Sequence, residues 1–463
     1  MPNEPNVPTF ERSTLQWAAL MGRHSIRWLL AELPKLEAEG VIDDATAGRL
    51  RAHYGGSVEG SGRRVILAVC AVFGALLIGG GIILLLAHNW EFLSRGARAT
   101  IAMAPLVAAQ VVAGWVLVRR EASTAWREGS GVLLALMVAT AIALVDQTYH
   151  TGGDLESFLW RWALLLALLP WLLNSTGVAI LFLGALTWWA GAALAGGHQV
   201  LWLWPVAAVG VVPHALQLLR GGRRGLRAAN LQWAVAIFLC VAAALSLERN
   251  VPGLWIVIYC GLFALMIVVG SAISSGDDGM WRRPLEAVGV VGSIVLWLIL
   301  TFAEPWDHIG WRHLRTVEHF SGGSMWLDVL LAVGLPVAAV AGAAFLLDRR
   351  RDGLQLLWVA ALPLAAVLWP VVAATDADWL GALVFNLVVF ITGVGTIAIG
   401  VRREQLATVN LGMLVVALLV VVRFFDSQLG FVARGLAFII VGVGFLAANV
   451  VLSKRMRPPK VDP

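Results

Sequence analysis

Apolar segments of about twenty residues recur through this chain from residue 65 almost to its C-terminus. An α-helix rises 1.5 Å per residue, so about twenty residues cross the roughly 30 Å hydrocarbon core of a bilayer. The composition agrees, because 59% of the residues are hydrophobic, only 14% are charged and the mean hydropathy is +0.80. Soluble domains carry far more charge. The sequence therefore predicts an all-α fold, a polytopic transmembrane helix bundle of about fourteen helices.

The predicted spans follow one another closely along the chain. They are Val65–Ala87, Ala99–Val118, Glu128–Val145, Phe158–Leu173, Thr176–Gly196, Val200–Leu219, Asn230–Leu247, Pro252–Ile273, Leu285–Ala303, Met325–Leu347, Leu354–Ala373, Trp379–Gly400, Gln405–Val422 and Phe431–Ser453. The segment Phe158–Leu173 is short and contains Arg161 and Pro170. Whether it crosses the bilayer fully is open at this point.

Basic residues between the spans indicate the orientation. Positively charged residues near span ends stay on the cytoplasmic side of the membrane. With the N-terminus inside, the cytoplasmic connections and the tail hold twenty Lys and Arg, and the outer connections hold six. Adding or removing one span in the middle would destroy this alternation. We therefore predict a multi-pass protein of the cell inner membrane with both termini in the cytoplasm.

The chain before the first span has a soluble, helical pattern. Leucines recur at helical spacing at Leu29, Leu30, Leu33 and Leu36. Gly40 can end this helix, and Asp43 or Asp44 can cap a second one. A hairpin of about forty residues buries too little to be stable alone, so we expect residues 14–54 to pack on a cytoplasmic protein partner, the bilayer surface or the rest of the chain. The predicted parts are the hairpin and a flexible linker at 1–62, the transmembrane domain at 63–453 and a basic tail at 454–463.

Short motifs at both ends of the chain resemble a bacterial membrane family, DUF2157. They are the hairpin end at residues 36–44, His88-Asn-Trp-Glu91 after a Gly-rich first span, and the polar turn Asp146-Gln-Thr-Tyr-His-Thr-Gly-Gly-Asp154. The C-terminal motifs Asn410-Leu-Gly412, Arg423-Phe-Phe-Asp426 and Arg434 are similar to the related DUF4401 group. The resemblance implies this architecture and names no reaction, because the family has no known function.

Ionisable residues gather in the connection after the third span. The set is Asp146, His150, Asp154, Glu156 and Arg161. Acids and an imidazole beside a cation at the membrane edge suit a cation or a polar headgroup, and charge within a membrane is costly enough to need a reason. The alternative is a solvated loop in which Gly152 and Gly153 form a turn and Arg161 extends to the interface.

A second polar set, Arg423, Asp426 and Arg434, lies at the outer ends of the last two predicted spans. Asp426 can bridge the two arginines and clamp the helices together without any ligand. The competing hypothesis is a site for an anion or a lipid phosphate.

The sequence gives little reason to expect metal or cofactor chemistry. His308, His313 and His319 stand five and six residues apart, which suits neither one face of a helix nor a metal-binding turn. The spans carry no Asp, Glu, Lys or Arg at their centres, and their polar residues there are Gln110, His214 and Asn386. We expect His214 to form a hydrogen bond between helices. We therefore predict no metal, no cofactor, no catalytic residues and no nucleic-acid partner.

The leading functional hypothesis is a membrane protein without its own catalytic centre. In this hypothesis the bundle handles or senses a lipid-like or small polar solute through an outer-facing polar pocket. The alternatives are a membrane enzyme that acts on a lipid-linked substrate and a scaffold that recruits a partner through its N-terminal hairpin.

Overall fold

The computed structural model describes residues 23–59, 93–149, 152–220, 226–247, 253–273, 282–307, 309, 325–350, 353–359, 361–375 and 377–424, with scattered positions between 432 and 443. The described residues form helices joined by short connections, and no strand occurs among them. The chain divides into two compact units, residues 1–95 and residues 96–463, and each is described by itself. The all-helical class predicted from the sequence is confirmed.

The first unit contains a helix pair, α2 (Arg23–Ala38) and α3 (Asp44–Glu59). Leu33 of α2 and Ala47 of α3 are fully buried. In the turn, Gly40 has φ = 69°, a conformation that glycine adopts without strain. The Thr46 side chain hydrogen-bonds to the Asp43 carboxyl at the start of α3 and lowers its pKa. The turn between the two helices therefore lies where the glycine and the capping aspartate predict, whereas α3 continues to Glu59, into the predicted linker.

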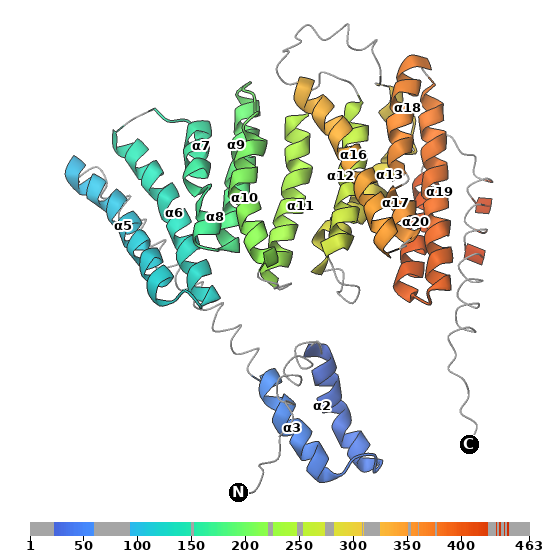
Figure 1. The fold of residues 1–463 in the computed structure, drawn as a ribbon, viewed down its shortest axis with the longest axis horizontal. Coiled ribbons are helices and arrows are strands. Elements are labelled where there is room, and N and C mark those ends of the chain that lie inside the picture. The colour runs from blue at the N-terminus through green and yellow to red at the C-terminus, as the bar shows by residue number, and fades with distance from the viewer. Residues whose placement is uncertain are drawn as a thin grey trace, which may run out of the picture. The chain divides into compact units, whose positions relative to one another are not determined.

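The second unit is a series of apolar helices (Figure 1). In chain order they are α5 (Arg95–Arg119), α6 (Thr124–Tyr149), α7 (Leu155–Leu166), α8 (Leu169–Leu172), α9 (Thr176–Ala195), α10 (Leu203–Arg220), α11 (Leu226–Ser246), α12 (Leu254–Ile273), α13 (Pro284–Leu300), α14 (Glu304–Asp307), α16 (Met325–Arg350), α17 (Gly353–Val359), α18 (Ala361–Thr375), α19 (Asp378–Arg402) and α20 (Leu406–Phe424).

Ten stretches of the described chain are long and apolar enough to cross a membrane. Two shorter apolar helices, Pro284–Leu300 and Val329–Phe345, accompany them. Together they fall on the twelve predicted spans from Ala99–Val118 to Gln405–Val422. The first predicted span lies outside the described residues, and so does the last, apart from scattered positions.

The predicted span Phe158–Leu173 is interrupted. α7 ends with Ala167 as its C-cap, and α8 begins after Leu168 with Pro170 in its first turn. Proline fits there because its missing N–H would have no partner in the first turn anyway. α7 and α8 still form one 18-residue stretch, Leu155–Leu172, that can cross a membrane.

Buried side chains of the second unit form two clusters. One cluster lies among helices α5 through α11 and includes Leu159, Phe182 and Leu186. We call these helices the N-terminal bundle. The other cluster lies among helices α12 through α20 and includes Ile256 and Phe385. We call these helices the C-terminal bundle. Helix α11 contributes to both clusters and connects the bundles.

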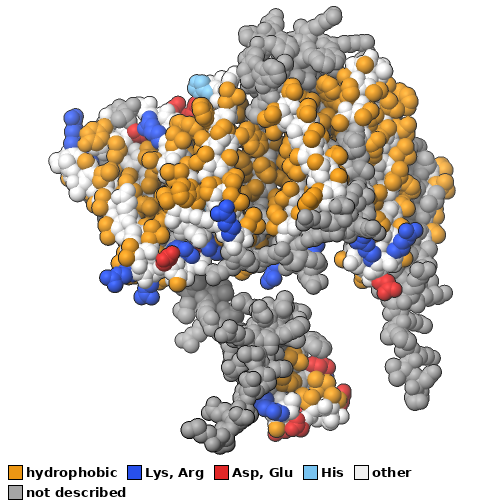
Figure 2. Space-filling view, in the orientation of Figure 1, with side chains coloured by type: hydrophobic (Ala, Val, Ile, Leu, Met, Phe, Trp, Pro, Cys, Tyr) orange, Lys and Arg blue, Asp and Glu red, His pale blue; other side chains and the backbone are white. Residues whose placement is uncertain are grey.

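Apolar side chains also cover the outside of these helices. Figure 2 shows them across the face of the second unit, between two edges that carry the charged side chains. Many large hydrophobic residues are well exposed, from Met103 in α5 to Leu414 in α20. A surface of this kind is stable against lipid and unstable against water.

Candidate functional site

Two polar clusters lie at opposite ends of helix α6. The first stands where α6 ends and α7 begins, and we call it the Arg161 cluster. It comprises Asp146, Asp154, Glu156, Arg161 and His198. The second stands where α6 begins, and we call it the Glu128 cluster. It comprises Arg127, Glu128, Asn174, Ser175, Thr176, His214 and Arg227.

An ion pair between α6 and α7 is the centre of the Arg161 cluster. The Arg161 Nη1 atom donates to both oxygens of Asp146, at 3.2 and 3.1 Å. The Asp146 side chain is 19% exposed and that of Arg161 is 45% exposed, so the guanidinium still faces the surroundings. Gly153 passes so close that an added Cβ would stand 2.9 Å from the Asp146 carboxylate.

The remaining acids of this cluster have separate partners. Asp154 is the N-cap of α7 and accepts hydrogen bonds from the Ser157 backbone N–H at 2.9 Å and from its hydroxyl at 2.6 Å. The bonds from Ser157 lower the pKa of the Asp154 carboxyl. Glu156 Oε2 lies 2.8 Å from His198 Nδ1 in the connection after α9.

His198 is not among the site residues predicted from the sequence. The predicted topology contained the signal, because it places the short connection after Gly196 on the same side of the membrane as residues 146–157. The structure thus brings Asp146, Asp154, Glu156 and Arg161 to one edge, as a single site requires. His150 lies outside the described residues.

The C-terminal set is separate from this cluster. Arg423 Nε donates to Asn386 Oδ1 at 3.0 Å, and its Nη2 donates to the Thr301 carbonyl. Its guanidinium also stands 5.0 Å from the centre of the Phe302 ring. Arg423 therefore ties α20 to α19 and to the end of α13. Asp426 and Arg434 lie outside the described residues, so their predicted bridge stays a prediction.

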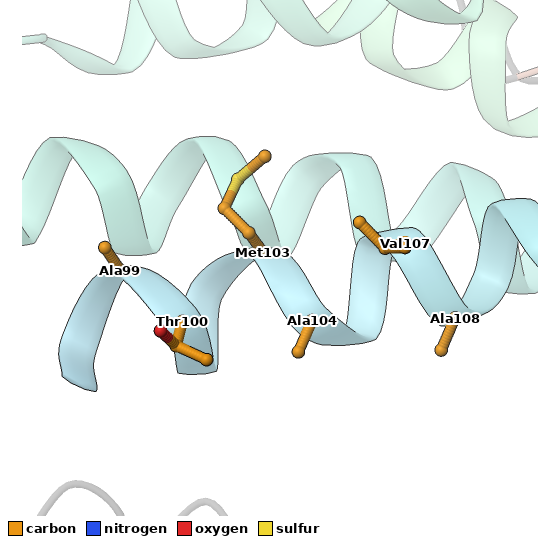
Figure 3. Close-up of a pocket in the computed structure, with 6 residues that line it drawn as sticks. All are labelled: Ala99, Thr100, Met103, Ala104, Val107 and Ala108. Atoms are coloured by element: carbon orange, nitrogen blue, oxygen red, sulfur yellow. The ribbon is translucent and has the colours of Figure 1, made fainter. Parts of the chain in front are cut away.

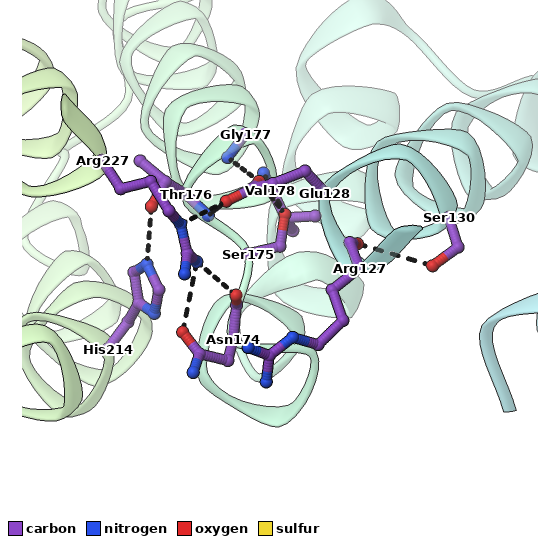
Figure 4. A network of polar contacts seen from close by, with 10 residues as sticks. All are labelled: Arg127, Glu128, Ser130, Asn174, Ser175, Thr176, Gly177, Val178, His214 and Arg227. Atoms are coloured by element: carbon purple, nitrogen blue, oxygen red, sulfur yellow. Dashed lines mark hydrogen bonds and ion pairs between the residues drawn. The ribbon is translucent and has the colours of Figure 1, made fainter. Parts of the chain in front are cut away.

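The Glu128 cluster joins four helices of the N-terminal bundle, α6, α9, α10 and α11 (Figure 4). The Glu128 carboxylate accepts hydrogen bonds from the Ser175 hydroxyl at 2.6 Å and from the backbone N–H groups of Thr176 and Gly177 at 3.0 and 2.8 Å. Its other partner is Arg227 Nε of α11, at 2.7 Å. A carboxylate of α6 thus satisfies the first N–H groups of α9, which have no partner within their own helix.

Arg227 and His214 extend this network. The Arg227 Nη2 atom donates to the backbone carbonyl and to the side-chain oxygen of Asn174, in the turn between α8 and α9. His214 of α10 is fully buried, and its Nε2 lies 3.2 Å from the Thr176 hydroxyl of α9. The hydrogen bond between helices predicted for His214 is confirmed.

Two hollows in the described structure lack such chemistry. The larger, of about 620 Å³, lies along α5 (Figure 3) and is lined by Ala99, Thr100, Met103, Ala104, Val107 and Ala108. Its hydroxyl, on Thr100, is bonded to the Gly96 carbonyl of the same helix. A second hollow of about 300 Å³, between α5 and α6, is lined by Val112, Ala125, Trp126, Gly129, Ser130 and Leu133. Both suit lipid chains or neighbouring helices better than a polar ligand.

Metal ligands do not gather in the described part of the chain, where no group of three or more His, Cys, Asp or Glu side chains can hold an ion. His308, His313 and His319 of the predicted outer connection lie outside the described residues.

Comparisons with known proteins agree with the architecture. No curated protein and no solved structure matches the chain. The family model described as "Predicted membrane protein (DUF2157)" matches residues 34–179, a range that contains the end of the hairpin, α5 to α8 and the start of α9. This chain is a multi-pass membrane protein that carries, over residues 34–179, the region of the DUF2157 family that its motifs indicate.

Proposed function

We propose that this protein binds a zwitterionic solute or lipid headgroup at the Arg161 cluster, on the outer side of the membrane, and that it handles or senses that molecule. The observation that carries the proposal is the convergence of three carboxylates, a guanidinium and an imidazole at one edge of the N-terminal bundle. A molecule with one cationic and one anionic group complements such a cluster, because Arg161 suits the anion and the acids suit the cation.

The orientation rests on the distribution of positive charge. Figure 2 shows most of the Lys and Arg side chains of the described second unit along the edge where α5 and α19 end. That edge carries Arg119, Arg220 and Arg402, each in the last turn of its helix. The Arg161 cluster stands at the other end of α6. The positive-inside rule then assigns the Arg161 cluster to the outer side and both termini to the cytoplasm.

Single cysteines test this orientation. In a chain with its native cysteines replaced, Gln199→Cys and Ala122→Cys place a thiol in exposed connections at the two edges. A membrane-impermeant maleimide should label Gln199→Cys in intact cells and Ala122→Cys only after permeabilisation. The reverse pattern would contradict the proposed orientation.

Binding can be measured with glycerophosphoethanolamine, a soluble phosphoethanolamine headgroup. In purified full-length protein it should raise the thermal midpoint further than the same concentration of inorganic phosphate does, because its ammonium group adds contacts with the acids. The double substitution Asp146→Asn/Arg161→Gln should abolish this extra stabilisation. The pair is removed together, so neither charge is left without its partner.

Arg95→Gln is the matched control, since Arg95 is an exposed cation at the same end of the N-terminal bundle. It should respond to glycerophosphoethanolamine as the wild-type protein does. An unchanged response in the Asp146/Arg161 variant, or no extra response in the wild-type protein, would disprove binding at this cluster.

A scaffolding role for the hairpin is a second candidate, because α2 and α3 form part of a compact unit of their own. If a cytoplasmic partner docks there, deletion of residues 14–54 should abolish co-purification of that partner while the remaining chain still inserts into the membrane. Loss of insertion would instead indicate a structural role.

A further inference from the structure

Buried N–H groups without a protein acceptor surround the turn at Asn174. This turn joins α8 to α9, and Asn174 has φ = 47°. Within the described structure, Arg127 Nε, Trp171 Nε1 and His214 Nδ1 are buried and make no hydrogen bond. Buried polar groups are normally satisfied, so three in one neighbourhood call for a common explanation.

Chain neighbours and hydrogen bonds place the three residues that carry these groups around the same turn. Arg127 precedes Glu128, whose carboxylate holds the start of α9. Trp171 lies three residues before Asn174, and its carbonyl accepts a hydrogen bond from Gln217 of α10 at 3.2 Å. His214, also of α10, contacts Thr176 directly after the turn. Figure 4 shows Arg127 and Arg227 approaching Asn174 from two sides, with His214 beside them.

The chemistry of these groups favours an anion. Arg127 Nε and Trp171 Nε1 can only donate. If His214 Nε2 accepts from the Thr176 hydroxyl, the imidazole proton lies on Nδ1, which is then a donor as well. The polar side chain nearest to this ring along α10 is Gln217, about one turn further on. The Glu128 carboxylate balances the charge of Arg227, whereas no ion pair in the described structure balances Arg127. The turn therefore has one cation in excess and N–H groups that need oxygen acceptors.

We propose that the Asn174 turn binds a phosphate group through Arg127, Trp171 and His214, carried either by a lipid headgroup or by a free solute. Arginine pairs with phosphate through two parallel hydrogen bonds, and the phosphate oxygens can accept from the indole and the imidazole at the same time. This site lies at the other end of α6 from the Arg161 cluster and does not depend on the function proposed there. By the positive-inside rule it faces the cytoplasmic leaflet.

Inorganic phosphate is the first probe. It should raise the thermal midpoint of the delipidated full-length protein, because a ligand that binds only the folded state stabilises it by an amount that grows with the ratio of its concentration to its Kd. Arg127→Gln should weaken the apparent affinity for phosphate at least tenfold. Arg119→Gln, an exposed cation at the same edge, should leave the affinity unchanged.

The second probe is lipid. Protein taken from vesicles of phosphatidylglycerol and phosphatidylcholine should retain phospholipid in native mass spectra, and Arg127→Gln should lose it while Arg119→Gln keeps it. A response in this experiment alone identifies a lipid headgroup as the source of the phosphate, and a response to inorganic phosphate alone identifies a free solute. Either result supports the site.

Trp171→Phe keeps the ring and removes only its N–H, so it tests the site even if Arg127→Gln fails to fold. It should weaken phosphate or lipid binding by a smaller factor than Arg127→Gln. Equal responses of the wild-type protein, Arg127→Gln and Trp171→Phe would overturn the proposal. An absence of any wild-type response to either probe would overturn it too, because water alone would then satisfy the buried donors.

Discussion

The two bundles of the membrane unit hold their helices together by different means. In the N-terminal bundle, the Glu128 carboxylate of α6 binds the start of α9 and the Arg227 side chain of α11. In the C-terminal bundle, α19 and α20 approach so closely at Gly393 and Gly412 that an added Cβ on Gly412 would stand 2.7 Å from the Gly393 carbonyl oxygen. The C-terminal bundle thus adds close contacts between glycine backbones to the tie that Arg423 makes, whereas the Glu128 network joins the helices of the N-terminal bundle.

The surrounding lipid explains why the helices need polar networks or close glycine contacts to associate. Apolar side chains gain little by leaving lipid for another helix, so association depends on close packing and on hydrogen bonds between helices. The C-terminal bundle repeats its close approach between α12 and α13, where a Cβ on Gly289 would stand 2.8 Å from the Phe263 carbonyl oxygen. A bundle held by tight packing has little room for a ligand, whereas one held by side-chain networks leaves polar groups available at its edges.

The largest expected effect is at Gly412. Gly412→Leu must push α20 away from α19, because the new side chain would overlap backbone atoms of Gly393 and Ile397. We expect a loss of about 3 kcal/mol or more in the free energy of unfolding, at the upper end of overpacking. Unfolding with SDS in mixed micelles measures it. Gly184→Leu in α9 is the control, since nothing lies within 4 Å of its Cβ position, and equal losses would refute the comparison.

A smaller effect is expected at Glu128. Glu128→Gln leaves the charge of Arg227, whose side chain is 26% exposed, without its partner. We expect a loss of about 2 kcal/mol, in the range for one member of a partly buried ion pair. Glu121→Gln, at an exposed position in the connection before α6, should change the stability little.

A double-mutant cycle sharpens this test. Arg227→Met alone should cost a similar amount, and Arg227→Met combined with Glu128→Gln should cost clearly less than the sum. Additive losses would show that the two side chains act independently. The Glu128 cluster would then not be the device that joins α6, α9 and α11.

The sequence predicts the helices of the two bundles better than it predicts the contacts that hold these helices together. Spans depend on local composition, so hydropathy places twelve of them on described helices. The Asp146–Arg161 pair was also within reach, because only fifteen positions separate its members. From the sequence, Glu128 was predicted only as the first residue of a span, and Arg227 only as a cytoplasmic charge. Their ion pair could not be predicted, because the two residues are 99 positions apart and no periodic pattern links them. The same holds for Gly412, whose neighbour Gly393 belongs to another helix.

The smallest expected effect is at Asp154, and it depends on pH. Hydrogen bonds from Ser157 hold the pKa of this carboxyl below its usual 3.8 in the folded state. Asp154 therefore stabilises α7 fully above about pH 4, and this contribution disappears as the pH falls through the lower, folded-state pKa. Asp154→Ala should lower the thermal midpoint slightly at neutral pH by removing the cap.

The pH profile separates the charge of Asp154 from its capping role. Asp154→Asn keeps a side-chain oxygen that can cap α7 and removes the titration, so its midpoint should lie near the wild-type value at pH 7. Between pH 5 and pH 3 the wild-type midpoint should fall more steeply than that of Asp154→Asn. Parallel profiles would mean that the Ser157 bonds do not depend on the charge. In that case the Asp154 cap, like the Gly412 contact, would depend on shape more than on charge, and the contrast between the bundles would rest on the Glu128 cluster and the Asp146–Arg161 pair.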